Sequence, residues 1–245
     1  MPRVPNISAC VPVRVAAIVL AATLAAACAL TAGGCADDTQ APVSATTASA
    51  ASQPDVPDSP VNAPQTAPRL PEHESVRARQ LAEAAMAQVG VTVGYDARYV
   101  PLSYPGGDVP LSTGACSDVI VRAFRKVGVD LQVKLHEDMT AHFSAYPQKW
   151  GLKAPDPNID HRRVPNLAVY FRRCGKERPT SADGADYWPG DIVTWSDQGR
   201  PHVGIVSTVP APDGTRFLMT HNIGAGAQTV DVLFGFPITG HYRYF

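Results

Sequence analysis

The stretch CSDVIVRAFRKVG, residues 116–128, decides the fold of this chain. Its apolar residues follow the 3.6-residue period of an amphipathic helix, and Gly128 stands where such a helix would end. Cys116 is therefore expected in the first turn of a helix. Three strand-like segments follow downstream: WPGDIVTW at 188–195, PHVGIVST at 201–208 and FLMTHNIG at 217–224.

The remaining elements are placed around this helix in the same way. Residues 73–89 are helix formers throughout, and residues 95–114 make a loop rich in Tyr, Pro and Gly. Two more helices are expected at 133–146 and 164–174. Strands are expected at 191–195, 202–208, 216–223, about 228–234 and 238–245. Helices first and an antiparallel meander afterwards is an α+β order.

Residues 1–71 have a composition that cannot supply a packed core. They hold seven charged residues and ten prolines, and all 18 aromatic residues of the chain lie at Tyr95 or later. One globular domain, 72–245, is therefore expected. Its 18 Lys and Arg residues balance its 18 Asp and Glu residues, so the basic field of a nucleic-acid binder is missing. We expect no nucleic-acid partner.

The start of the chain is typical of an export signal. Arg3 and Arg14 precede an uncharged apolar run at 15–30, which is short for a membrane-spanning helix. Small residues then lead into Cys35 in a way that resembles the bacterial lipoprotein box, so Cys35 is expected to be lipidated. Cys28 is a second candidate for lipidation. Cleavage with secretion and an uncleaved anchor stay open as alternatives.

A linker separates this signal from the domain. Residues 36–71 are rich in Ala, Pro, Ser and Thr, and a segment of this kind stays extended and solvated. The expected division is a lipoprotein signal peptide at 1–35, a linker at 36–71 and a domain at 72–245. An anchor with a tether places the domain beside a membrane. We expect a lipid-anchored protein of the bacterial cell envelope, at the outer membrane or the periplasmic or extracellular face.

Cys116 is the first candidate functional residue. A thiol at a helix N-terminus lies in the positive end of the helix dipole beside unpaired backbone N–H groups, which lowers the thiol pKa. The same N–H groups can bind an oxyanion when a carbonyl is attacked. Two structural interpretations stay open: a buried cysteine that acts as a small apolar residue, and a disulfide with Cys174 in an oxidising compartment.

The order of these segments resembles the NlpC-type cell-wall cysteine peptidases of the papain-like superfamily. There a cysteine opens a helix, a histidine opens a strand of the form HVGI, and a third polar residue lies on the next strand. The resemblance implies a papain-like fold in which N-terminal helices pack on an antiparallel sheet. It also implies Cys116 as nucleophile, His202 as general base, His221 as the residue that orients the base, and Tyr104 near the oxyanion site. Where the family has Asp-Cys-Ser-Gly, this chain has Ala-Cys-Ser-Asp.

Three further segments are similar to a bacterial family catalogued as domain of unknown function 1287. They are HEDM at 136–139, DPNIDHRRVPNL at 156–167 and ITGHYR at 238–243. The name of that family promises no activity, so the chemistry rests on the residues themselves.

Strand alternation tests the histidine assignments without the family. His202 and Gly204 share one face of their strand, and the missing side chain of Gly204 leaves room beside the imidazole. On the next strand, His221 and Asn222 point to opposite faces, so only one of them can orient His202. We favour His221 and keep Asn222 as the alternative.

A polar loop before the last helix offers further candidates. It begins like a calcium-binding loop, but His161 and Leu167 occupy the positions that need Gly and Glu, so the calcium interpretation fails. Asp160, His161 and Arg162 are candidate substrate-binding residues, because a guanidinium binds a carboxylate through two hydrogen bonds. The alternative is a loop ordered by its own side-chain hydrogen bonds.

The resemblance implies an envelope hydrolase that cleaves amide bonds of peptidoglycan stem peptides through an acyl-enzyme. Peptidoglycan or its peptides are then the partner, and we expect a monomer without cofactor or metal. Two other classes stay open. One is an inactive envelope module that binds wall polymer or a protein. The other is a zinc-dependent hydrolase with His161, His202, His221 and an acid as ligands, for which no HExxH or paired CxxC motif is present.

Overall fold

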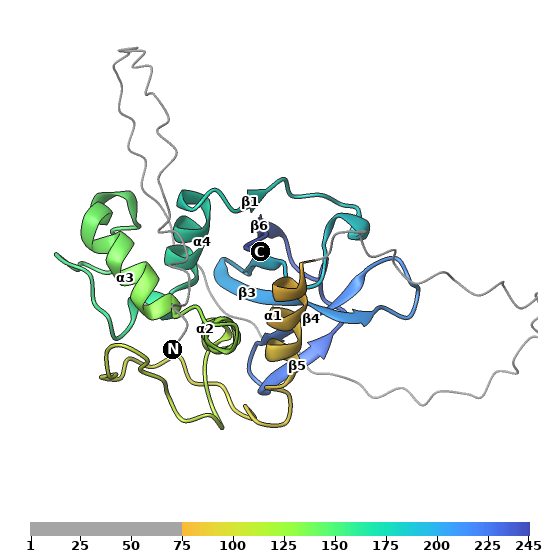
Figure 1. Cartoon of the computed structure of the whole chain (residues 1–245), viewed down its shortest axis with the longest axis horizontal. Coiled ribbons are helices and arrows are strands. Elements are labelled where there is room, and N and C mark those ends of the chain that lie inside the picture. Colours follow the sequence, from red (N-terminus) through yellow and green to blue (C-terminus); the bar gives the residue numbers. More distant parts are fainter. Residues whose placement is uncertain (1–74) are drawn as a thin grey trace, which may run out of the picture. The chain divides into compact units, whose positions relative to one another are not determined.

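The computed structural model describes residues 75–245; the expected signal peptide, the linker and Cys35 lie outside the described residues. In this range the helices come first (Figure 1): α1 (Val76–Met86), α2 (Cys116–Lys126), α3 (Leu131–His142) and α4 (Val164–Arg173). The strands follow: β1 (Glu177–Arg178), β2 (Ile192–Asp197), β3 (Arg200–Pro210), β4 (Phe217–Asn222), β5 (Ala227–Val230) and β6 (Ile238–Tyr242). Short 3-10 helices are η1 (Phe143–Ala145), η2 (Asp160–Arg162) and η3 (Gly184–Asp186). The predicted α+β order is confirmed.

The strands form one six-stranded sheet in the order β1-β6-β2-β3-β4-β5, and each neighbouring pair is antiparallel. In the β2–β3 hairpin, Trp195 lies opposite His202. The next ladder, between β3 and β4, includes the pair of Ile205 with Thr220. The first residues of β3 and the last residues of β4 therefore lie side by side at one end of the sheet.

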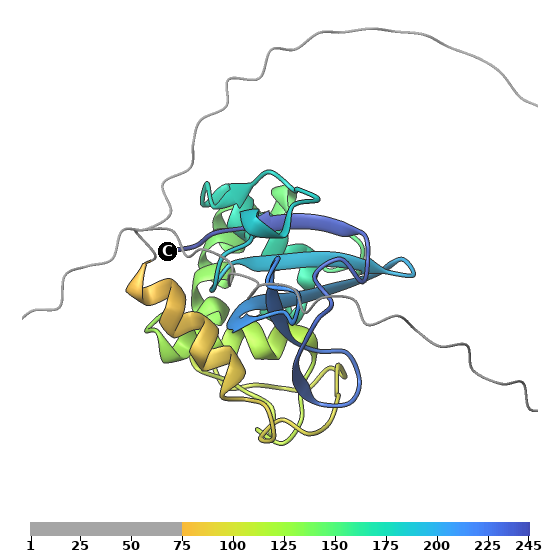
Figure 2. The same cartoon turned by 90° about the vertical axis from the view of Figure 1, so that its right-hand side faces the viewer.

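Apolar side chains fill both faces of this sheet. On one face α1 and α2 pack against β3, and Figure 2 shows both helices on the same side of the strands. The period of α2 predicts its buried face, because Val119, Ile120, Ala123 and Phe124 are all fully buried. A smaller cluster covers the other face: Tyr187, Val193, Trp195, Val206, Phe217, Met219 and Leu233. Packing on the sheet therefore places α2 against β3.

Element boundaries differ from the sequence-based ones where local contacts decide them. The helix expected at 133–146 starts at Leu131, because the Asp130 carboxylate caps it with a 3.0 Å hydrogen bond from the N–H of Gln132. The last strand ends at Tyr242, since Tyr244 turns away to pack edge-on against the ring of Phe124. No helix within residues 75–245 has both the length and the apolar character needed to cross a membrane.

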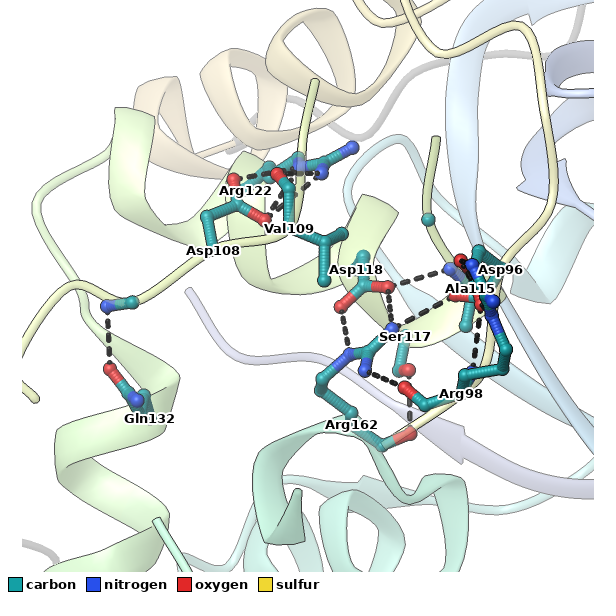
Figure 3. A network of polar contacts seen from close by, with 12 residues as sticks. Asp96, Arg98, Asp108, Val109, Ala115, Ser117, Asp118, Arg122, Gln132 and Arg162 are labelled. Carbon is teal, nitrogen blue, oxygen red and sulfur yellow. Dashed lines mark hydrogen bonds and ion pairs between the residues drawn. The ribbon is translucent and has the colours of Figure 1, made fainter. Parts of the chain in front are cut away.

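A buried ion pair joins three separate segments next to Cys116 (Figure 3). Arg162 of η2 donates two hydrogen bonds, each 2.9 Å long, to the carboxylate of Asp118 in the first turn of α2. The same guanidinium donates to the carbonyl oxygens of Asp96 (2.9 Å) and Arg98 (2.8 Å) in the preceding loop. The side chains of the two ion-pair partners are 2% and 4% exposed. One charged contact therefore ties the loop, the helix and η2 together.

Replacing Arg162 should destabilise the whole domain. Arg162→Met leaves the Asp118 carboxylate buried without its partner, so we expect the free energy of unfolding to fall by about 3–5 kcal/mol. Urea unfolding followed by circular dichroism measures this loss. Arg98→Met is the control, because the Arg98 side chain is 85% exposed and its ion pair with Asp96 lies in water. Equal losses from both substitutions would contradict the importance of the buried pair.

Candidate functional site

Cys116 is the first residue of α2, as predicted. The Asp118 carboxylate accepts a 2.6 Å hydrogen bond from the N–H of Ala115 and so closes the start of the helix. The thiol is buried and accepts hydrogen bonds from the backbone N–H groups of Ser117 and Val203. Within residues 75–245 no hydrogen bond joins this thiol to an imidazole. The sulfur is thus surrounded by backbone donors.

Burial reverses the expected ionisation of this thiol. Loss of solvent raises the pKa of Cys116 to about 11, and the nearby Asp118 charge acts in the same direction. The backbone N–H groups of Val203, Ser117 and Cys116 itself lower it but do not offset the burial. The predicted position of Cys116 at a helix N-terminus is confirmed, whereas the predicted low pKa of its thiol is wrong. Cys116 is also a free thiol, so the alternative of a disulfide with Cys174 is wrong.

The thiol meets β3 where the ladder to β4 ends. The pairs between β3 and β4 include Ile205 with Thr220 but none that contains Val203. The N–H of Val203 donates to the Cys116 thiol instead. Two amide donors, from Val203 and Ser117, therefore converge on one sulfur, and such a pair can bind a developing oxyanion.

His202 and His221 meet across β3 and β4. Nε2 of His202 and Nδ1 of His221 are 2.7 Å apart, which is a hydrogen-bond distance. Burial lowers the pKa of each imidazole to about 4; for His202 the neighbouring His221 adds to this effect and Asp197 opposes it. Both rings are therefore neutral at pH 7, and one donates its N–H to the other. Nδ1 is the second nitrogen of the His202 ring.

The indole of Trp195 covers one face of the His202 imidazole. The two rings stack with centroids 5.6 Å apart and an interplanar angle of 24°. Gly204 makes room for the indole, because a Cβ there would lie 3.1 Å from two of its ring carbons and 3.0 Å from the Thr220 carbonyl oxygen. The space left by the missing side chain is thus filled by Trp195. Sequence reasoning missed this residue, although it follows from the register of the β2–β3 hairpin.

Asn222 points away from His202, as strand alternation predicts. Its side-chain amide donates hydrogen bonds to the carbonyl oxygens of Gly94 (3.0 Å) and Gly114 (2.9 Å). Both acceptors belong to the loop that leads into α2. The structure therefore places His221 against His202, and it places Asn222 beneath the loop that carries Cys116.

Tyr95 is the tyrosine whose pKa depends on the charge of Cys116. Burial raises the pKa of its phenol to about 12, and the charges of Cys116 and Asp118 add to this shift. Tyr104, the tyrosine that the family resemblance singles out, lies edge-on against His136 of α3, with ring centroids 5.2 Å apart. Its spacing before Cys116 therefore places it beside α3, and Tyr95, nine residues earlier, is the tyrosine whose pKa depends on Cys116. The tyrosine-rich composition of residues 95–114 was the feature of the sequence that could have pointed to Tyr95.

The polar residues of η2 are buried in the fold. Arg162 is committed to Asp118 and to backbone carbonyls, and Asp160 accepts a hydrogen bond from the N–H of Asp156. His161 is 2% exposed; burial, followed by the charges of nearby arginines, lowers its pKa to about 4. Asp160 and Arg162 thus belong to a loop ordered by its own hydrogen bonds, whereas Nδ1 of His161 is buried without a hydrogen-bond partner among the described residues. We therefore assign Asp160, His161 and Arg162 to the fold and no longer to substrate contact.

The described part of the chain offers no ready metal site. Within residues 75–245 no group of three or more His, Cys, Asp or Glu side chains is arranged to hold a metal ion. His202 pairs with His221, whereas His161 lies near Asp130 and Asp108. The zinc alternative, a site drawn from these histidines and an acid, therefore has no group of three ligands among these residues.

Known proteins resemble this chain to different degrees. The solved structures of NlpC1 and NlpC2 from Trichomonas vaginalis match it with TM-scores of 0.38 and 0.37 and sequence identities of 15% and 14%. Each match covers 71% of this chain, which spans 46% and 49% of those two proteins. Scores in this range carry no conclusion about shared chemistry.

Sequence comparison is more decisive. The "Uncharacterized protein YijF" of Escherichia coli (strain K12) is 58% identical over 166 residues, a match that covers 67% of this chain and 80% of that protein. Residues 82–244 match the family model described as "Domain of unknown function (DUF1287)". This match spans well over half of the sequence, and the chain belongs to the DUF1287 family.

Proposed function

We propose that this protein is an envelope thiol hydrolase that cleaves amide bonds of peptidoglycan stem peptides through an acyl-enzyme intermediate. One observation carries the proposal: the Cys116 thiol is held at the N–H of Val203, the residue directly after His202. The His202 imidazole is in turn fixed by His221. Cys116 is thus held at the strand that carries the candidate base. The His202 imidazole lies with Trp195 on the opposite face of that strand from Val203, so it must turn toward the sulfur for the reaction to occur. The resemblance of the motifs to the NlpC-type peptidases supplies the reaction and substrate class.

In the proposed mechanism the Cys116 sulfur attacks the carbonyl carbon of the amide, and the thiol proton passes to Nδ1 of His202. This requires the tautomer in which Nε2 of His202 carries a proton and donates it to Nδ1 of His221, because Nδ1 of His202 then holds a lone pair. The oxyanion accepts hydrogen bonds from the N–H groups of Ser117 and Val203. The imidazolium gives its proton to the leaving amine, and water then hydrolyses the thioester.

The resting site holds no preformed ion pair. With a thiol pKa of about 11 in Cys116 and an imidazole pKa of about 4 in His202, the proton stays on sulfur at pH 7. Proton transfer therefore accompanies the attack on substrate. The hydroxyl of Tyr95 is a neutral donor at this pH, because burial and the charges of Cys116 and Asp118 raise its pKa to about 12.

A catalytically inactive envelope module that binds wall polymer is the second candidate function. The buried, neutral Cys116 thiol without a hydrogen bond to His202 favours this alternative. The two candidates share the same surface and differ in turnover alone. Incubation with purified peptidoglycan and mass analysis of the released fragments separates them.

The three proposed residues should fail in different ways in that assay. Cys116→Ala should abolish fragment release, and His202→Ala should lower its rate roughly 10²–10⁴-fold because the general base is lost. His221→Ala should cost less, since His221 only orients the base, and His221→Asn should recover part of the rate.

His142→Ala is the matched control for the histidine variants. His142 lies on α3 and contacts Asp138, and its loss should leave the rate unchanged. Full activity of Cys116→Ala would contradict the thiol mechanism. Absence of fragments from the unsubstituted protein would favour the inactive module.

The reactivity of Cys116 should follow its burial. Alkylation by iodoacetamide should be slow at pH 7 and keep accelerating up to about pH 11, the pKa of the buried thiol, whereas an ordinary cysteine levels off above about pH 8.5. Mass spectrometry of the modified peptide measures the rate, and Cys116→Ser sets the background. A plateau below pH 8.5 would reveal a thiolate paired with an imidazolium and would contradict the neutral resting site.

The proposed envelope anchor rests on Cys35. Cys35→Ser should move the protein from the membrane fraction to the soluble fraction, because the acyl chains that hold it at the bilayer are lost. Cys28→Ser is the matched control and should leave fractionation unchanged. A membrane-bound Cys35→Ser protein, or a shift caused by Cys28→Ser, would refute lipidation at Cys35.

A further inference from the structure

A groove of about 280 Å³ runs between α4 and the β2–β3 hairpin. Val164, Pro165 and Ala168 form its α4 wall, and Trp195 and Pro201 belong to its hairpin wall. These side chains are apolar, so the groove suits the aliphatic part of a ligand. Its volume is that of a single large amino-acid residue rather than of a long chain.

The groove begins beside the candidate site. Pro201 directly precedes His202, and Trp195 both lines the groove and stacks on the His202 ring. At the start of α4, the Ser117 hydroxyl donates a 2.7 Å hydrogen bond to the carbonyl oxygen of Arg162. Ser117 follows the candidate nucleophile, and Arg162 lies just before the groove wall. The residues that line the groove are thus sequence neighbours of the candidate site residues.

The lining of the groove also includes a positive charge without a carboxylate partner in residues 75–245. Arg172 lines the groove from the last turn of α4 and makes no ion pair with any carboxylate of residues 75–245. Its neighbour Arg173 behaves differently, because it pairs with Asp138 at 2.6 Å. The two arginines of α4 are therefore not equivalent: one is used by the fold and the other is available.

A buried hydroxyl lies close to this charge. The Tyr242 hydroxyl lies close to Thr194 and Arg172, and both neighbours lower its pKa through hydrogen bonding. Burial raises the pKa of Tyr242, and the positive charge of Arg172 partly offsets that shift, which shows that the guanidinium is within electrostatic reach. The Thr194 side chain lines the same groove.

We propose that this groove is a substrate subsite for an amino-acid residue that carries a free carboxylate, with its aliphatic part between α4 and the β2–β3 hairpin and its carboxylate on Arg172. A guanidinium binds a carboxylate through two parallel hydrogen bonds, so a neutral carboxamide in the same place loses the charge-assisted contact. The inference rests on the proposed function, because it assigns the groove to the peptide on one side of the scissile amide.

The test is a binding measurement that does not depend on turnover. The full chain with Cys116→Ala is titrated by calorimetry with a synthetic stem peptide that carries free carboxylates, and with the same peptide in which they are carboxamides. We expect the carboxylate form to bind about tenfold more tightly. Adding Arg172→Gln should make the two peptides bind equally. Adding Lys126→Gln, which removes one positive charge at the opposite end of α2 from Cys116, should leave the preference intact.

A second substitution checks the place of the ligand. Ala168→Phe fills the apolar part of the groove and should weaken both peptides by a similar factor, with circular dichroism confirming that the variant is folded. A preference that survives Arg172→Gln overturns the subsite, and so does the absence of peptide binding.

Fragment release from peptidoglycan by the unsubstituted protein tests the proposed hydrolase separately. Release without an Arg172-dependent preference overturns the subsite alone. An Arg172-dependent preference without any release supports the subsite and overturns the hydrolase.

Discussion

The ion pair between Asp118 and Arg162 is the contact on which the arrangement around Cys116 depends. Hydrophobic packing places α2 on the sheet, but it is non-directional and does not define the first turn of a helix to within a hydrogen bond. The Asp118 carboxylate does so, because it binds both Arg162 and the N–H of Ala115. Any movement of that turn would expose an unpaired charge to the protein interior, which is far more costly than a small loss of packing.

The same ion pair extends its effect to the loop before the helix. Through Arg162 it holds the carbonyl oxygens of Asp96 and Arg98, which follow Tyr95 by one and three positions. The backbone next to Tyr95 is thus held by Arg162, whose partner Asp118 also caps α2, the helix that begins at Cys116. Positional order near Cys116 comes from a few directional contacts rather than from a large number of weak ones.

Sequence analysis correctly predicted the helices and strands whose apolar residues recur with a regular period. The 3.6-residue period of α2 places Cys116 at its start, and the two-residue period of the strands separates His221 from Asn222. Sequence reasoning failed for properties that depend on contacts between residues far apart in the chain. The position of Cys116 at a helix N-terminus is visible in the sequence, but the burial that raises its pKa depends on what the fold packs over it.

The missed residues have the same explanation. Tyr95 lies in a loop without a period, and the loop path is decided by hydrogen bonds to η2 and β4. Trp195 belongs to a correctly expected strand, yet its contact with His202 needs the register of the hairpin, which the sequence does not show. Arg162 looked like a ligand for a substrate carboxylate because its chemistry fits one; the carboxylate that it binds is Asp118 of the same chain.

Cys116, His202 and His221 all lie in surroundings that favour the uncharged form at pH 7. Each is buried, and burial shifts each pKa toward the neutral form. Such a setting is costly for a resting charge, but it strengthens hydrogen bonds to a charge that develops in place, because little water competes for them. The N–H groups of Ser117 and Val203 are therefore the groups best placed to respond to charge at this sulfur.

Two neighbouring residues of β4 serve opposite faces of the sheet: His221 contacts His202, and Asn222 holds the loop that enters α2. A single-residue insertion or deletion within β4 would exchange them, turning an amide toward the imidazole and an imidazole toward the glycine carbonyls. Both partners would be lost in one genetic event. Length variation among relatives should therefore be tolerated in the turn at 223–226 and purged from the strand before it.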